Sequence, residues 1–149
     1  MRIYFDPSFL IPLYVEELAS TDVRAFVMRS SPVVLLNELQ ELELKNAIRQ
    51  KVMRGEITEG MATRRLRLLD DDCIAGLVQR KEVTWKAVYS RAEQLSRKLA
   101  KGRICRAFDL LHIAIAGTSS VRRFATLDNG QAELARAAAE LKIIELPTT

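Results

Sequence analysis

Three acidic residues stand out because each lies beside or within an apolar run. Asp6 follows the run RIYF, and Asp128 follows FATL. Asp109 is the one acid in the apolar stretch RAFDLLHIAIAG, which is predicted to form a buried helix. A charge on such a helix is costly unless it is paired or binds a metal. The residue types therefore point to carboxylate chemistry, with a bound cation as one outcome.

A fourth acid comes from the predicted helix over residues 37–53. Leu39 and Ala47 lie one turn away from Glu43 and give it a partly apolar face, whereas the surroundings of Glu41 look more solvated. The periodicity favours Glu43 as the acid that faces inward. Glu41 stays open as the alternative, because it lies two residues away.

Each acid also has an ordinary structural explanation. Asp6 and Asp128 are both suited to cap a helix, since aspartate is a favoured N-cap residue. Asp109 could form a salt bridge with Arg103 or Arg106. These explanations do not exclude a shared site, because a capping carboxylate has a second oxygen available.

A group of carboxylates in one cleft repels itself unless a divalent cation is present. The chain has a single histidine, His112, which excludes a zinc site built from several histidines. Oxygen ligands favour magnesium or manganese. His112 is expected either as a satisfied core histidine or as a hydrogen-bond partner of Asp109, one turn away.

The elements that must position these acids alternate along the chain. Short apolar runs predict strands over 2–5, 32–36, 124–127 and 143–146, with a weak edge strand around 76–83. Helices are predicted over 8–14, 20–29, 37–53, 58–70, 84–101, 106–117 and 128–142. This alternation predicts an α/β fold with a mostly parallel sheet. Sites in such sheets form outside the carboxyl ends of the strands, where Asp6 and Asp128 are expected.

The composition is that of an ordinary globular protein, with 48% hydrophobic and 28% charged residues in 149. One domain over 1–149 is expected. No apolar run reaches the roughly 18–20 residues of a membrane helix, and the start does not look like a signal peptide. The expected location is the cytoplasm. Cys73 and Cys105 form no CxxC pair and are expected as reduced, buried thiols.

The positive charge is concentrated in one segment. Residues 80–106 contain nine basic and two acidic residues, a net charge of +7. Such a segment either tracks a phosphate backbone or forms a solvated helix face. Trp85 and Tyr89 within it could stack a base, although packing against the sheet is the favoured interpretation.

Four sequence stretches together resemble a known family, the PIN-domain ribonucleases, and specifically the VapC-type toxins of toxin–antitoxin pairs. The stretches are IYFDPSFLIPLY, LELKNAIR, RAFDLLHIAIA and FATLDNGQAELA, in the family's order and over essentially the whole chain. They carry Asp6, Glu43, Asp109 and Asp128. One departure is Pro7, where family members often have serine or threonine, so that Ser8 would assist the acid.

The resemblance implies a three-layer α/β/α fold with a central, mostly parallel sheet of about five strands. It implies an endoribonuclease dependent on magnesium or manganese, with the four acids as metal-binding and catalytic residues. Ser8, Asn46 and His112 would support them. The resemblance also implies an RNA substrate, a cognate antitoxin and a homodimer. The basic residues expected to face RNA phosphates are Lys86, Arg97, Lys98, Lys101, Arg103 and Arg106.

Two other readings remain. The chain could be a non-catalytic PIN-like module that binds RNA or a protein partner, which a missing acid would favour. It could also be a phospho-accepting receiver domain. That fold needs adjacent acids after the first strand and a lysine after a late strand, whereas this sequence has the single Asp6 and the run FATLDN.

Overall fold

A computed structural model describes residues 1–138 and 141–146 of the chain. Within them, a five-stranded sheet has the strand order β3-β2-β1-β4-β5, and all four pairings are parallel. The strands are β1 (Arg2–Phe5), β2 (Val33–Leu36), β3 (Val78–Arg80), β4 (Arg123–Ala125) and β5 (Lys142–Ile144). The predicted edge strand is β3, which has only three residues.

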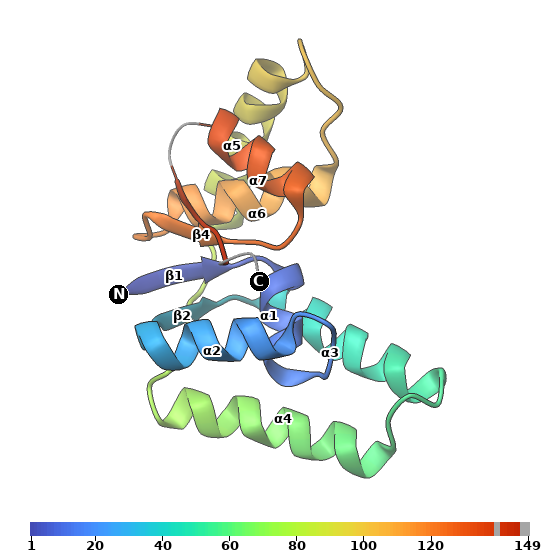
Figure 1. The fold of residues 1–149 in the computed structure, drawn as a ribbon. Helices are drawn as coiled ribbons and strands as arrows, with labels where there is room; N and C mark the ends of the chain where they lie inside the picture. Colours follow the sequence, from blue (N-terminus) through green and yellow to red (C-terminus); the bar gives the residue numbers. More distant parts are fainter. Residues whose placement is uncertain (139–140, 147–149) are drawn as a thin grey trace.

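Helices cover both faces of the sheet (Figure 1). One layer holds α1 (Pro7–Tyr14), α2 (Ser20–Ser30), α3 (Glu38–Met53) and α4 (Glu59–Ile74). The other holds α5 (Trp85–Leu99), α6 (Ala107–Thr118) and α7 (Asn129–Ala137). The predicted three-layer α/β/α, PIN-like fold is therefore confirmed.

Two hydrophobic cores follow from the alternation of side chains along β1. Ile3 and Phe5 belong to the core shared with the α1–α4 layer, whereas Tyr4 belongs to the core shared with α5–α7. All three are at most 1% exposed. Successive strand residues point to opposite faces, so one short strand anchors both layers. Tyr4 carries the only polar side-chain atom of these three residues. It places that atom in the core shared with α5–α7, which is called the upper core below.

The order of the strands creates a crevice at one edge of the sheet. From β1 the chain proceeds outward to β2 and β3, then crosses to β4 and β5 on the other side of β1. The connections after β1 and β4 therefore leave in opposite directions, and ligands bind at such a switch point in open α/β sheets. Asp6 directly follows β1, and Asp128 lies three residues after β4.

Some local predictions were wrong. Ser20 and Thr21 both suit an N-cap, but neither caps α2: the helix begins at Ser20, whose hydroxyl donates to the Val15 carbonyl and accepts from the Glu17 amide. The helix α4 continues past Asp70 to Ile74, and Lys142 belongs to β5 rather than to the preceding helix. Part of that predicted helix, 139–140, lies outside the described residues.

Other features concern solvent and membranes. Cys73 and Cys105 are free thiols, as expected, but both are half-buried rather than buried. Across residues 1–138 and 141–146, no helix has the length and apolar character that crossing a membrane requires.

Candidate active site

Asp6 occupies a buried position between the end of β1 and the start of α1. It is 6% exposed, and its Oδ2 accepts hydrogen bonds from the Ser8 amide at 3.2 Å and the Ser8 hydroxyl at 2.7 Å. Pro7 is the first residue of α1, where its missing N–H costs nothing. Ser8 therefore assists Asp6 directly despite Pro7. Burial raises the pKa of Asp6, while the hydrogen bonds from Ser8 oppose that rise.

Thr126 joins the end of β4 to Asp6. Its hydroxyl donates to Asp6 Oδ2 at 3.2 Å, lies 3.1 Å from the Ser8 hydroxyl, and accepts from the Asp128 amide. The Leu127 amide in turn donates to Ser8 Oγ at 3.0 Å. Thr126 was not predicted as a site residue. The pattern that could have indicated it is a hydroxyl-bearing residue two positions before an aspartate at the end of a strand. These hydrogen bonds tie the segment that follows β1 to the segment that follows β4.

Asp109 and Asp128 line one pocket beside Asp6. This pocket has a volume of about 310 Å³ and also includes Arg103, Arg106 and Glu133. Burial raises the pKa of Asp109, the Asp128 carboxylate raises it further, and Asp6 adds to the rise. In the described part of the chain Asp109 forms no ion pair, so the predicted salt bridge to Arg103 or Arg106 is absent. The carboxylates therefore lie close enough to repel one another.

Gln131 connects these two acids through α7. Its amide donates to Asp128 Oδ1 at 3.0 Å, which makes Asp128 the N-cap of α7 as anticipated. Its side-chain Nε2 donates to the Asp109 carbonyl at 3.2 Å. Gln131 is 2% exposed, so the start of α7 is fixed against the first turn of α6. No local sequence pattern indicates this role of Gln131.

Glu43 reaches across the sheet edge from α3 to α6. Its Oε2 lies 3.0 Å from Nε2 of His112. Both atoms are buried, and among the described residues neither has a well-aligned hydrogen bond, so the pair is close but imperfectly oriented. His112 Nδ1 lies 2.8 Å from the Tyr4 hydroxyl. Of the two expectations for His112, the buried core histidine holds, whereas the bond to Asp109 is not formed and the ring faces Glu43.

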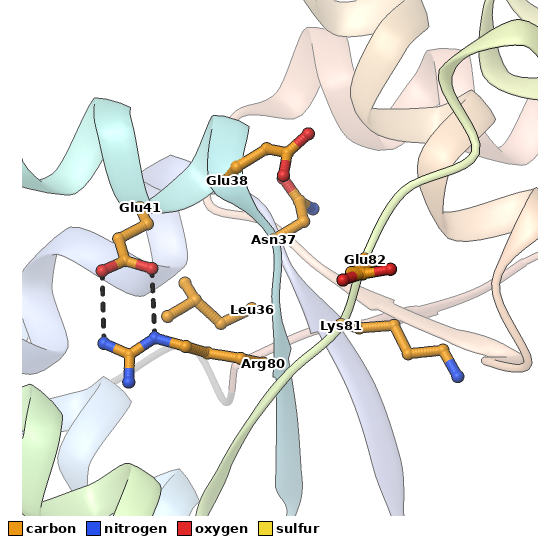
Figure 2. A pocket seen from close by; sticks show the side chains of 7 residues that line it. All are labelled: Leu36, Asn37, Glu38, Glu41, Arg80, Lys81 and Glu82. Carbon is orange, nitrogen blue, oxygen red and sulfur yellow. Dashed lines mark hydrogen bonds and ion pairs between the residues drawn. The ribbon is translucent and has the colours of Figure 1, made fainter.

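Glu41 lies on a different side of α3 and pairs with basic groups (Figure 2). Lys45 and Arg80 both contact its carboxylate, and Arg80 also contacts Asp70. Its side chain is 17% exposed, against 28% for Glu43, so the expectation that Glu41 is the more solvated acid was wrong. Because two cations neutralise Glu41, Glu43 is the better candidate for a site carboxylate.

The remaining predicted residues divide into two groups. Arg103 and Arg106 line the acidic pocket. Lys86 lies in the first turn of α5. At 1.5 Å per residue, it is roughly 16–17 Å along the helix from Arg97. Arg97 pairs with Glu93 on the exposed face. Lys98 and Lys101 are exposed near the end of α5, and Asn46 is exposed on α3. Of the predicted basic residues, Lys86 is therefore the one that lies well away from Arg97 along the helix.

The two aromatic residues of α5 also differ from each other. Trp85 packs at the margin of the upper core and donates its indole N–H to Glu38. Tyr89 is 59% exposed, so its predicted packing against the sheet was wrong. Their ring centroids are 5.8 Å apart.

The donor types of the site suit a hard divalent cation. Asp6, Asp109, Asp128 and Glu43 offer only oxygen, and the mutual repulsion at Asp109 is what a cation would relieve. Among the described side chains, however, no three acidic, histidine or cysteine residues are close enough to hold an ion together. The chemistry and location fit a cation, and binding one would require the carboxylates to converge further.

The fold and the crevice define the class of protein: a three-layer α/β/α domain of the PIN-like type. It is similar to two solved structures. VapC20 of Mycobacterium tuberculosis, a sarcin–ricin loop cleaving toxin, matches with a TM-score of 0.63 at 16% identity, over 88% of this chain and 93% of that chain. FitAcB from Neisseria gonorrhoeae matches with a TM-score of 0.57 at 15% identity, over 96% of each chain.

At these identities the similarity is one of fold. No protein-family model and no curated protein sequence matches the chain.

Proposed function

We propose that this protein is an endoribonuclease toxin that depends on magnesium or manganese. The observation that supports the proposal is that Asp109 and Asp128 line one pocket beside the switch point, where burial and the nearby charges of Asp128 and Asp6 raise the pKa of Asp109. The similarity in fold to VapC20, whose name describes cleavage of the sarcin–ricin loop, supports RNA as the substrate class.

The four acids Asp6, Glu43, Asp109 and Asp128 would hold the cation. A divalent ion bound there supplies a Lewis acid for the phosphate and lowers the pKa of the attacking water. The protein's own side chains do the positioning: Ser8 and Thr126 donate to Asp6 and direct its carboxylate. Arg103 and Arg106 at the pocket rim offer cationic partners for RNA phosphates.

The decisive experiment replaces Asp109 with asparagine, which keeps the size of the side chain and removes its charge. Purified wild type is expected to cut single-stranded RNA only when Mg²⁺ or Mn²⁺ is added. Asp109→Asn is expected to lose activity by at least 100-fold, because the substitution removes a cation ligand, while its thermal unfolding stays cooperative. Wild type that is folded, free of inhibitor and inactive on every RNA contradicts the proposal.

One observation favours a second candidate, a non-catalytic PIN-like module that binds RNA or a protein. Among the described residues no three potential ligands converge on one point. The same assay separates the two candidates, because the module binds labelled RNA in a metal-independent way and leaves it intact. Glu59→Gln, an exposed change on α4 away from the crevice, is the matched control for both measurements.

The partners follow from the same proposal. We expect a cognate antitoxin that inhibits the nuclease, a homodimer as the assembled form, and the cytoplasm as the location. Co-expression with the neighbouring open reading frame and light scattering of the purified protein test the first two.

A further inference from the structure

A chain of buried hydrogen-bonding groups runs from the start of α3 through β1 and α6 back to Glu43 on α3. Its members are Asn37, Tyr4, His112 and Glu43, and the first three are at most 5% exposed. The separations are 3.3 Å from Asn37 Nδ2 to the Tyr4 hydroxyl, 2.8 Å from there to His112 Nδ1, and 3.0 Å from His112 Nε2 to Glu43 Oε2. Residues far apart in sequence thus form one line of neighbouring polar groups, in which the last contact, from His112 to Glu43, is close but not well aligned.

The first member of the line has a fixed orientation. Asn37 is the N-cap of α3, and its Oδ1 accepts from the backbone amides of Leu39 and Gln40. Its Nδ2 must therefore be the donor end, and it donates to Gln40 Oε1 at 2.7 Å as well as to Tyr4. Gln40 is oriented in turn, because its Nε2 donates to the Phe5 carbonyl. The helix cap thus decides which way the Asn37 amide points.

The direction of the remaining bonds follows by elimination. The Tyr4 oxygen accepts from Asn37, so its single proton is free to be donated, and His112 Nδ1 is its neighbour. A proton on Nδ1 instead would leave the tyrosine proton without this acceptor and would turn an unprotonated Nε2 toward the Glu43 carboxylate. Two acceptors 3.0 Å apart in a buried site repel each other.

We infer that Tyr4 and Asn37 are positioning residues, which hold His112 with a proton on Nε2 so that it donates to Glu43 and orients that carboxylate beside the candidate site. This inference rests on the proposed function for the role of Glu43. It assigns the hydroxyl of Tyr4 a task beyond packing in the upper core. It also ties the orientation of Glu43 to the N-cap of the helix that carries it.

The first test is spectroscopic and needs no variant. Because His112 is the only histidine, ¹⁵N-labelled protein gives one pair of ring nitrogen signals, whose shifts show which nitrogen carries the proton. The expected result at neutral pH without metal is a proton on Nε2 and none on Nδ1. A proton on Nδ1 overturns the inference.

The second test compares Tyr4→Phe with Tyr14→Phe. Each change removes one hydroxyl from a tyrosine that is 1% exposed, and the Tyr14 hydroxyl donates to Asp72, far from the proposed ligands. Tyr4→Phe is expected to weaken Mn²⁺ binding and RNA cleavage by about 10- to 100-fold, the usual effect of losing a group that orients a ligand. Tyr4→Phe is also expected to weaken the preference of His112 for a proton on Nε2. Tyr14→Phe should change none of these.

Equal Mn²⁺ affinity in the two variants overturns the inference. If wild type binds Mn²⁺ but cuts no RNA, the ribonuclease proposal fails, while the difference in Mn²⁺ affinity still judges the role of Tyr4. If wild type binds no Mn²⁺, both proposals fail. If Tyr4→Phe does not fold, the wild-type tautomer alone decides.

Discussion

Gly130 shows how a single residue shapes the candidate site. A Cβ atom added at this position would lie 3.2 Å from Asp128 Oδ1, closer than nearly all such contacts in proteins. The hydrogen atom of glycine leaves the carboxylate room to cap α7 while it faces the pocket. The close approach of Asp128 therefore explains why position 130 holds glycine, although the backbone conformation there does not require glycine.

We predict opposite effects on activity and stability for Gly130→Ala. The added methyl group displaces the Asp128 carboxylate by a few tenths of an ångström, so cleavage is expected to fall on the order of tenfold. Alanine also suits the first turn of a helix better than glycine, so stability should stay equal or rise by up to about 1 kcal/mol. Cleavage assays and urea unfolding check the two parts. Unchanged cleavage by Gly130→Ala would contradict the steric explanation.

Asp6 illustrates why several readings of one residue can hold together. Its Oδ2 accepts from the Ser8 amide and hydroxyl at the start of α1, as the capping explanation predicted. Its position at the end of β1 is also the one that a cation site at this sheet edge needs. The sequence could not choose between these roles, because they use different oxygens of one carboxylate.

At the scale of the elements, Arg80 joins three segments beside the crevice. Arg80 is the last residue of the edge strand β3, and it contacts Glu41 on α3, as Figure 2 shows. It also contacts Asp70 on α4. Burial raises the pKa of Glu41, but the hydrogen bonds from Arg80 and Lys45 outweigh it and lower the pKa below its ordinary value of 4.5. This ion-pair group fixes the short edge strand to the helix that carries Glu43.

A pH-dependent stability follows from that lowered pKa. The folded protein keeps Glu41 ionised to a lower pH than the unfolded chain does, so its contribution is complete above about pH 4.5 and is lost as the pH falls through the folded pKa. We predict that Glu41→Gln lowers stability by about 1 kcal/mol at pH 7 and by much less at pH 3. Urea unfolding at both pH values, with Glu59→Gln as control, measures this. An equal loss at both would contradict the ion-pair explanation.

At the scale of the whole molecule, the charges that matter for RNA depend on the fold rather than on the sequence segment. Only Arg103 and Arg106 among the six predicted basic residues line the pocket with Asp109 and Asp128. Arg97 is occupied by Glu93, and Lys86 lies at the opposite end of α5. The net charge of +7 in this segment therefore does not by itself say which of its basic residues face the pocket.

We predict that the double variant Arg103→Gln, Arg106→Gln weakens RNA binding and makes it less sensitive to salt. Each lost phosphate contact should reduce the slope of log affinity against log salt by about 0.7 for single-stranded RNA. Arg64→Gln, an exposed change on α4 in the other helical layer, is the control and should leave the slope unchanged. Fluorescence anisotropy at several salt concentrations measures both. The same slope in all proteins would exclude the pocket rim as the RNA contact.

The sequence alone determined the elements, because they follow from local pattern. The alternation of apolar strands and helices predicted the parallel sheet, and aspartate at two strand ends predicted the edge where they meet. The periodicity of α3 favoured Glu43 without excluding Glu41, and only the ion pairs of Glu41 with Lys45 and Arg80 separate the two acids. These features were predictable because side-chain period, capping and strand-end position depend on neighbours within a few residues.

Only the tertiary structure decided which groups touch. Thr126 on Asp6, Gln131 between Asp109 and Asp128, and Tyr4 behind His112 are contacts between residues 22–120 positions apart, and no local pattern marks them. The neighbour of His112 could not be read from the sequence for the same reason: Asp109 lies one helical turn away along the chain, whereas the packing of α3 against the sheet edge brings Glu43 to His112 Nε2. Long-range packing sets these distances, and it is fixed only when both layers close on the sheet.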